Sequence, residues 1–137
     1  MIFVDTSAWI AMWNRKDENH QTALKFKDKI TSSGRSLLTS NYVLDETYTL
    51  LLLNVGYKGT IEFRHHFEEL RDLAAVAVYF VSEEVEAEAW EIFERFNLDK
   101  QWSFTDCTSK AIMEREGLTE AFAFDRHFDQ MGFVRSP

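Results

Sequence analysis

The sequence contains little cysteine, proline or glycine. Its single cysteine, Cys107, cannot form a disulfide within the chain, which excludes a disulfide-rich secreted scaffold. One proline and five glycines among 137 residues leave little material for flexible linkers, so we expect a single domain over residues 1–137. No apolar run approaches the ~20 residues of a membrane-spanning helix, and the N-terminus lacks the pattern of a signal peptide. We therefore expect a cytoplasmic protein with no membrane partner.

Positive charge is also scarce. The chain has 15 Lys and Arg against 23 Asp and Glu, which gives a formal net charge of −8. Passive nucleic-acid binders usually present a basic face, so this balance argues against that class. It argues less against a metal-dependent phosphodiesterase, because an acidic cluster holding a divalent cation becomes locally positive towards phosphate. The remaining composition is that of a globular protein, with 45% hydrophobic residues and twelve Phe.

Short apolar strands alternate with longer helical patterns along the chain. The pattern predicts strands at 2–4, 36–40, 75–81, 121–124 and 132–134, and helices at 8–13, 18–31, 42–53, 60–73, 83–96 and 104–116. Strands that are apolar throughout and alternate with helices are typical of a parallel sheet covered on both faces. The sequence therefore predicts an α/β fold with a central, mostly parallel β-sheet flanked by helices, and sites at the carboxyl ends of its strands.

Two predicted strands each lead into an aspartate. Asp5 follows the apolar residues 2–4, and Asp125 follows the strand at 121–124. Taken alone, Asp5 could equally be a turn residue or a helix cap, and Ser7 could cap the helix that follows. Two strands that deliver an acid from the same kind of position favour a shared site. Asp129, one helical turn after Asp125, is a weaker candidate that we expect to be solvated.

A third acid lies within an apolar stretch of a predicted helix. Tyr42, Val43, Leu50 and Leu53 fall within about 60° of Glu46 on a helical wheel, so its neighbours are mostly apolar. An isolated acid is costly to bury unless it is paired or bound to metal. The adjacent Asp45 points about 100° away. We therefore favour Glu46 over Asp45, although a partly exposed glutamate is the alternative.

The fourth acid, Asp106, has two possible explanations. Ser103 as N-cap with an acid three residues later resembles a capping box, and Lys110 lies four residues on, where it could pair with Asp106. Either arrangement would give Asp106 a purely structural role, with no part in catalysis or metal binding. A first-turn acid also projects from the helix N-terminus towards the mouth of a parallel sheet, so Asp106 remains a candidate site residue.

Four acids from separate segments would repel one another if they met in space, but they could coexist around a divalent cation. Oxygen ligands without a cysteine and histidine set indicate Mg²⁺ or Mn²⁺ rather than zinc. His65 and His66 are adjacent and cannot share a helix face, and His20 and His127 are lone histidines. His127 is near Asp125 in the sequence, so contact with a substrate is an alternative to a purely structural role. No glycine-rich phosphate loop is present.

Four stretches, in this order, resemble the PIN-domain family, and specifically the VapC-type toxins of toxin–antitoxin pairs. They are FVDTSAWIA at 3–11, LLTSNYVLDETYTLL at 37–51, WSFTDCTSKAIME at 102–114 and EAFAFDRHFDQMGF at 120–133. The resemblance covers essentially the whole chain. Each motif alone is weak, but four in the right order in a chain of this length are fairly specific.

The resemblance implies a metal-dependent endoribonuclease that uses Mg²⁺ or Mn²⁺. It places the family's metal-binding acids on Asp5, Glu46, Asp106 and Asp125, with Thr6, Ser7 and Thr105 as polar support. It also implies RNA as substrate, a cognate antitoxin protein as partner, and a homodimer. Basic side chains that could select the RNA are Lys100, Lys110, Arg115 and Arg126.

Three other functions are compatible with a small α/β protein with clustered acids. A phospho-accepting receiver domain has paired acids after its first strand and a lysine after its last, whereas Thr6 follows Asp5 and Arg126 follows Asp125 here. A haloacid-dehalogenase-like phosphatase needs an aspartate at the position that Ser7 occupies. A PIN-like module that binds partners or nucleic acid without cleaving RNA stays open as the alternative.

Overall fold

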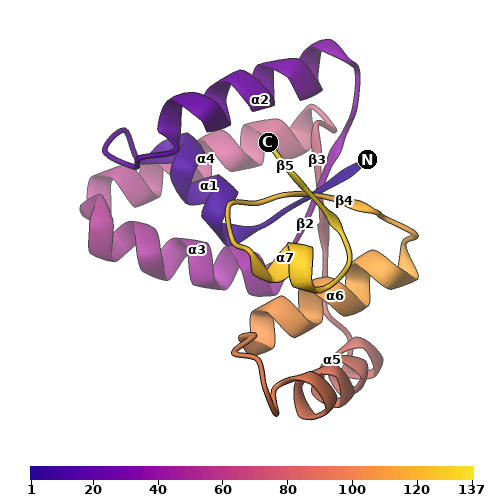
Figure 1. Cartoon of the computed structure of the whole chain (residues 1–137). Coiled ribbons are helices and arrows are strands. Elements are labelled where there is room, and N and C mark those ends of the chain that lie inside the picture. Colours follow the sequence, from indigo (N-terminus) through magenta and orange to yellow (C-terminus); the bar gives the residue numbers. More distant parts are fainter.

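A computed structural model describes all 137 residues. Five strands and seven helices alternate along the chain (Figure 1), in the order β1 (Ile2–Val4), α1 (Thr6–Trp13), α2 (His20–Ser32), β2 (Leu37–Ser40), α3 (Asn41–Asn54), α4 (Gly56–Asp72), β3 (Val76–Tyr79), α5 (Glu83–Phe96), α6 (Phe104–Arg115), β4 (Glu120–Phe122), α7 (His127–Gln130) and β5 (Val134–Ser136). The predicted elements are all present: the strand at 2–4 and the helix at 83–96 have the predicted ends, the others have shifted ends, and the short α7 is additional. None of the helices has the length and apolar character needed to cross a membrane.

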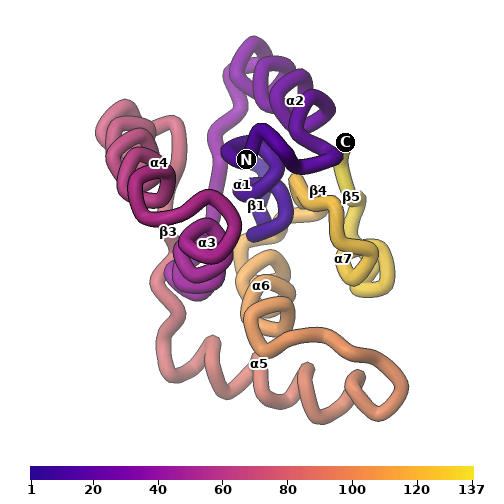
Figure 2. The backbone as a smooth tube through the Cα atoms, turned by 90° about the vertical axis from the view of Figure 1, so that its left-hand side faces the viewer, coloured from indigo at the N-terminus to yellow at the C-terminus, as the bar shows by residue number.

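The five strands form one sheet in the order β3-β2-β1-β4-β5, and every neighbouring pair is parallel. The chain moves outwards from β1 to β3 and then returns to the other side of β1 to add β4 and β5. Right-handed crossovers then place α1 to α4 on one face and α5 and α6 on the other. In Figures 1 and 2, α2 and α4 lie apart from α5, whereas α3 lies beside α6 and contacts it. The prediction of a mostly parallel sheet between helices is confirmed.

The reversal of strand order creates a switch point between β1 and β4. Phe3 is paired with Ala121 and Val4 with Phe122, so the carboxyl ends of these two strands are adjacent. In open parallel sheets, crevices that bind ligands form outside the carboxyl ends at such a point. Asp5 follows β1 directly and Asp125 lies three residues beyond β4. The topology therefore brings together two of the predicted acids.

The strands next to this point lie in the main hydrophobic core. All residues of β1 and β2 are buried, and Phe122 of β4 is fully buried. Trp9 of α1 packs edge-on against Phe67 of α4, with ring centroids 5.3 Å apart. Its indole nitrogen donates to Thr39 Oγ1 at 3.2 Å, and this hydroxyl donates to the carbonyl of Val4 at 3.0 Å. These contacts hold α1 against the carboxyl ends of β1 and β2.

Helix starts follow the capping rules, with one correction. Ser40, Ser82 and Ser103 each accept a bond from a first-turn backbone N–H through the side chain, as N-caps do. The sequence suggested Ser7 as the cap of the first helix, but α1 begins at Thr6 and Asp5 is its N-cap. An aspartate at this position accepts from the free amides of the first turn, so α1 can begin directly where β1 ends.

Candidate functional site

An open cavity of about 350 Å³ lies at the carboxyl ends of β1 and β4. We call it the acidic cavity, because five of its fourteen lining residues are acids and none is Lys or Arg. It is lined by Asp5, Thr6, Ser7, Ile10, Asp17, Asn19, Glu46, Leu50, Gln101, Ser103, Asp106, Phe124, Asp125 and His127. All four acids that the sequence singled out are in this list. They reach one cavity from the end of β1, from α3, from α6 and from the segment after β4.

Asp5 is held by its neighbour Ser7. Its side chain is 4% exposed, and Oδ2 accepts bonds from the Ser7 amide at 3.1 Å and the Ser7 hydroxyl at 2.7 Å. The same hydroxyl accepts from the Phe124 amide at 3.0 Å, so Ser7 joins the end of β1 to the segment leading to Asp125. Burial raises the pKa of Asp5 to about 7, the bonds from Ser7 lower it, and the charge of Asp106 raises it. A cation nearby would favour the charged carboxylate.

Asp106 lies in the first turn of α6 and is also buried, with 7% exposed. The Ser103 amide donates to its Oδ2 at 3.1 Å, while the Asp106 amide donates to Ser103 Oγ at 3.0 Å. The capping box is therefore real, and it fixes the carboxylate in the cavity wall. The suggested pairing with Lys110 is wrong, because Lys110 pairs with Glu114 one turn further along.

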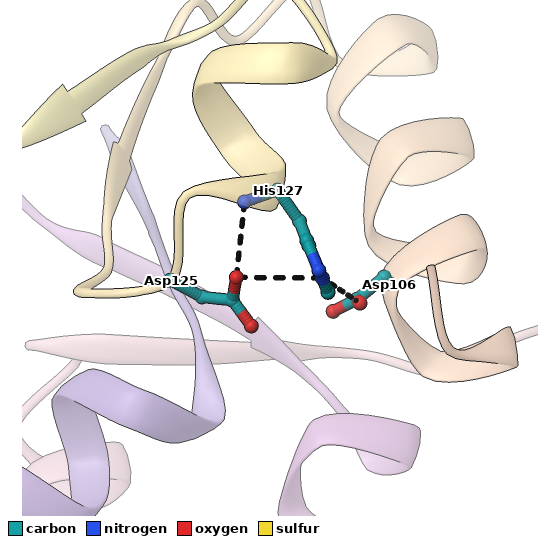
Figure 3. A group of neighbouring side chains, drawn as sticks. All are labelled: Asp106, Asp125 and His127. Carbon is teal, nitrogen blue, oxygen red and sulfur yellow. Dashed lines mark hydrogen bonds and ion pairs between the residues drawn. The ribbon is translucent and has the colours of Figure 1, made fainter. Parts of the chain in front are cut away.

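Asp125 and His127 complete a compact group with Asp106 (Figure 3). The amide of His127 donates to Asp125 Oδ1 at 3.0 Å. The ring atom His127 Nδ1 lies 2.8 Å from Asp106 Oδ2 and 3.3 Å from Asp125 Oδ1. One potential ligand atom from each of the three residues falls within 4.8 Å of the others. His127 thus lies between two acids that come from different elements.

Glu46 projects from α3 and is half-buried. Burial raises its pKa, and the charges of Asp106, Asp125 and Asp45 raise it further, while a hydrogen bond from Thr105 lowers it. Asp45 is exposed and does not line the acidic cavity. The helical wheel therefore assigned the two side chains to the correct sides. Glu46 and Asp5 lie in the cavity but outside the compact group of Asp106, Asp125 and His127.

The remaining predicted residues divide into those at the cavity and those away from it. Thr6 and Ser7 line it, whereas Thr105 does not and reaches it only through Glu46. Asp129 is outside, paired with Arg135 at 2.9 Å. Sequence reasoning missed Asp17, Asn19 and Gln101, which reach the cavity from two connecting loops. No periodic pattern marks loop residues, so only their position in the fold identifies them.

The donor set of the acidic cavity fits a hard divalent cation. Four carboxylates from separate elements face one space, two of them nearly buried, and no Lys or Arg side chain in the lining balances their charge. Carboxylate oxygens suit Mg²⁺ and Mn²⁺, and a lone imidazole with no thiolate is not a typical zinc set. The raised pKa values of Asp5 and Glu46 have the same cause, which is negative charge held out of water without a counter-ion.

Comparison with known proteins agrees with this geometry. The chain is 39% identical over 134 residues to the 23S rRNA-specific endonuclease VapC20 of Mycobacterium tuberculosis, covering 98% of this chain and 96% of that protein. It is 25% identical over 126 residues to a VapC ribonuclease of Archaeoglobus fulgidus, covering 91% and 77% of the two chains. A crystal structure of M. tuberculosis VapC20, a sarcin–ricin loop-cleaving toxin, superposes with a TM-score of 0.83 at 36% identity and covers 98% of this chain and 97% of that one.

The family assignment rests on both sequence and fold. The family model for the PIN domain matches residues 2–134, which is nearly the whole chain. The four motifs that suggested this family all lie within that range. With a relative of similar length at 39% identity and a matching crystal structure, the chain belongs to the PIN-domain family.

Proposed function

We propose that this protein is a metal-dependent endoribonuclease of the VapC type that hydrolyses RNA phosphodiester bonds in the acidic cavity. The observation that carries the proposal is the convergence of Asp5, Glu46, Asp106 and Asp125 on one open cavity whose lining contains no Lys or Arg. The two named relatives, one an rRNA endonuclease and one a ribonuclease, give it further support. A module that only bound RNA would gain nothing from repelling the phosphate with five acids.

In this proposal the four carboxylates hold Mg²⁺ or Mn²⁺. A cation bound there would polarise the scissile phosphate and ease deprotonation of the attacking water. The residues of the chain position the ligands: Ser7 fixes the orientation of Asp5, and Ser103 fixes that of Asp106. Without a cation the lining repels phosphate, so the metal-free protein should not cleave RNA.

The relatives support a proposal about the substrate class. At 39% identity over nearly the full length, the rRNA endonuclease VapC20 is a reasonable guide to substrate type. We therefore propose a structured RNA, and a stem-loop with the sequence of the sarcin–ricin loop is the first substrate to test. An RNA substrate would also place the activity in the cytoplasm.

The central experiment measures cleavage of that stem-loop with Mg²⁺ or Mn²⁺, and with EDTA, for the wild type, Asp5→Asn and Asp106→Asn. Asp45→Asn is the matched control, since Asp45 is an exposed acid beside the cavity that does not line it. Cleavage that needs the metal, is lost in both site variants and persists in the control would support the proposal. Cleavage that continues in EDTA or in both site variants would contradict it. Binding of RNA without any cleavage would favour the interaction module.

Two protein partners belong to the same proposal. A VapC-type toxin pairs with an antitoxin that blocks its site, and we expect this chain to have such a partner.

We also expect a homodimer. Helices α3 and α4 offer an apolar surface for it, because Leu53 is 75% exposed and Tyr57 is 74% exposed. Light scattering after size-exclusion chromatography tests the dimer: Leu53→Lys should give a monomer, whereas Leu98→Lys, an exposed residue after α5, should not change the mass.

A further inference from the structure

An RNA strand that enters the acidic cavity brings phosphates on both sides of the cleaved bond. A divalent cation can neutralise charge only near its own ligands, and the lining of the cavity has no Lys or Arg. The flanking phosphates therefore need positive charge from another surface. In a protein with a net charge of −8, few basic side chains are free to supply it.

Most basic residues are already engaged. Nine of the fifteen Lys and Arg side chains lie within 4.0 Å of a carboxylate. Three of the four basic candidates from the sequence are among them: Lys100 with Asp99, Lys110 with Glu114, and Arg115 with Glu88. Six side chains remain without such a partner, namely Arg15, Lys16, Lys25, Lys29, Arg95 and Arg126. Only Arg15 and Lys16 are neighbours in the chain, and both are exposed.

Arg15 and Lys16 line a second open hollow of about 730 Å³, which we call the basic hollow. Asn14, His20 and Asn54 are also in its lining, and Glu62 is its one acid. That acid already has a cation, because Lys58 lies 3.9 Å from it on the same helix. The basic hollow therefore has an excess of positive charge, in contrast to the acidic cavity.

The loop between α1 and α2 lies between the acidic cavity and the basic hollow. It contributes an acidic side chain to the first and basic side chains to the second. Asp17 and Asn19 line the acidic cavity, whereas Arg15 and Lys16 line the basic hollow. Helices α1 and α3 each run from the acidic cavity to the basic hollow. Their residues Ile10 and Leu50 line the acidic cavity, and Trp13 and Asn54 line the basic hollow. From Glu46 to Asn54 the helix rises by about 12 Å, at ~1.5 Å per residue. A stacked strand, at ~3.4 Å per nucleotide, covers this in three or four nucleotides.

Internal hydrogen bonds hold the loop in shape. Asn14 Oδ1 accepts from the Lys16 amide at 3.1 Å, and the Asp17 amide donates to the carbonyl of Asn14 at 2.9 Å. Asp17 Oδ1 accepts from the Asn19 amide at 2.8 Å. His20 Nδ1 lies 2.7 Å from the carbonyl of Ala11, so that nitrogen carries the proton and donates. A loop fixed in this way loses little entropy when it binds a ligand.

We propose that Arg15 and Lys16, in the basic hollow, bind RNA phosphates a few nucleotides away from the bond that is cleaved in the acidic cavity. This inference rests on the proposed function, because it takes RNA as the ligand. Arg and Lys contacts to phosphate give affinity that is insensitive to base sequence and falls steeply with salt. These two residues would therefore determine the affinity for the RNA strand and not the choice of target sequence.

The test compares Arg15→Gln/Lys16→Gln with Lys25→Gln/Arg95→Gln. The control double variant has the same net charge and removes two other exposed cations without a carboxylate partner, from α2 and α5. Binding of a short fluorescein-labelled RNA is followed by anisotropy in EDTA over a series of salt concentrations. Loss of two phosphate contacts should make the slope of log K against log salt shallower by about 1.4, at ~0.7 per contact with a single strand. The control should keep the wild-type slope.

Cleavage kinetics with Mn²⁺ give a second readout. We expect Arg15→Gln/Lys16→Gln to raise KM several-fold and to leave kcat close to that of the control. If the wild type binds but cleaves no RNA, the proposed function fails while the binding comparison still tests the phosphate site. If the wild type cleaves and the two double variants have equal slopes and KM values, the inference is overturned and the proposed function stands. Failure of the wild type to bind RNA even at low salt, or an effect confined to binding of a protein partner, would also overturn it.

Discussion

His127 Nδ1 lies 2.8 Å from Asp106 Oδ2, and this contact links the start of α7 to the first turn of α6. Because the His127 amide also donates to Asp125 Oδ1, one residue fixes the relative positions of two carboxylates. In metal sites, such supporting bonds usually orient the ligands and tune their affinity. His127 therefore supports two of the four acids at once.

Substitution of His127 by alanine should weaken cleavage without unfolding the protein. Loss of a supporting partner of metal ligands typically costs 10–100-fold in metal affinity or activity, so we expect a fall in kcat/KM of about that size and a higher Mn²⁺ requirement. Titration of cleavage rate against Mn²⁺ measures both. His65→Ala, an exposed histidine on α4, is the control, and equal behaviour of the two variants would remove His127 from the site.

The two adjacent acids of α3 should behave differently. Glu46→Gln removes a carboxylate from the cavity and should lower the cleavage rate by at least about 100-fold, if Glu46 is a metal ligand. Asp45→Asn changes an exposed neighbour and should stay within about two-fold of the wild type, because solvent screens its charge. Single-turnover cleavage of the same stem-loop by both variants makes the comparison, and similar losses would reject the assignment of Glu46.

The metal-free protein should become less stable as the pH rises from about 4 to 7. The pKa of Asp5 is about 7 in the folded protein and near its ordinary value of 3.8 when unfolded. The folded state therefore binds more protons between these two values, so this residue's contribution to the unfolding free energy falls as pH increases from about 4 to 7. Melting temperatures in EDTA should fall less steeply over this range for Asp5→Asn than for the wild type. Mn²⁺ should restore the wild type at pH 7, and parallel curves for the two proteins would contradict the expected linkage.

Loss of the Ser7 hydroxyl should destabilise the fold and disturb the site together. Ser7→Ala removes the bond to Asp5 and leaves the Phe124 amide without its acceptor, which costs about 1 kcal/mol because these bonds are only partly buried. Urea unfolding should show this loss, whereas Ser32→Ala, at the exposed end of α2, should have a small effect. Cleavage at a temperature where Ser7→Ala is still folded should also be reduced, and unchanged activity there would show that Ser7 only supports the fold.

The order of elements and the four acids could be predicted from the sequence because both depend on local patterns. Apolar runs followed by Asp5 and Asp125 marked the strand ends, and the helical wheel separated Glu46 from Asp45. The order of strands in the sheet could not be predicted in this way. Pairing of β1 with β4 joins residues more than a hundred positions apart, and it is this pairing that places Asp5 near Asp125.

The misses have physical causes of a similar kind. The sequence leaves Asp5 open as a turn residue, a cap or a ligand, and it suggests Ser7 as the cap of a helix over 8–13. In the structure α1 starts at Thr6, and the Asp5 carboxylate both caps this helix and lines the cavity. Asp17 and Gln101 come from loops, where no periodicity indicates direction. Spacing alone allows Lys110 to pair with Asp106, but Glu114 lies at the same spacing on the other side of Lys110 and is its partner.

The pairing of β1 with β4 also determines when the site can exist during synthesis. Asp5 and Glu46 leave the ribosome early, but the strand that completes the centre of the sheet, together with Asp106, Asp125 and His127, is made in the last third of the chain. An incomplete nascent chain would therefore carry only half of the carboxylates. Under the proposed function, RNA cleavage by the nascent chain would therefore be excluded until translation of the domain was nearly finished.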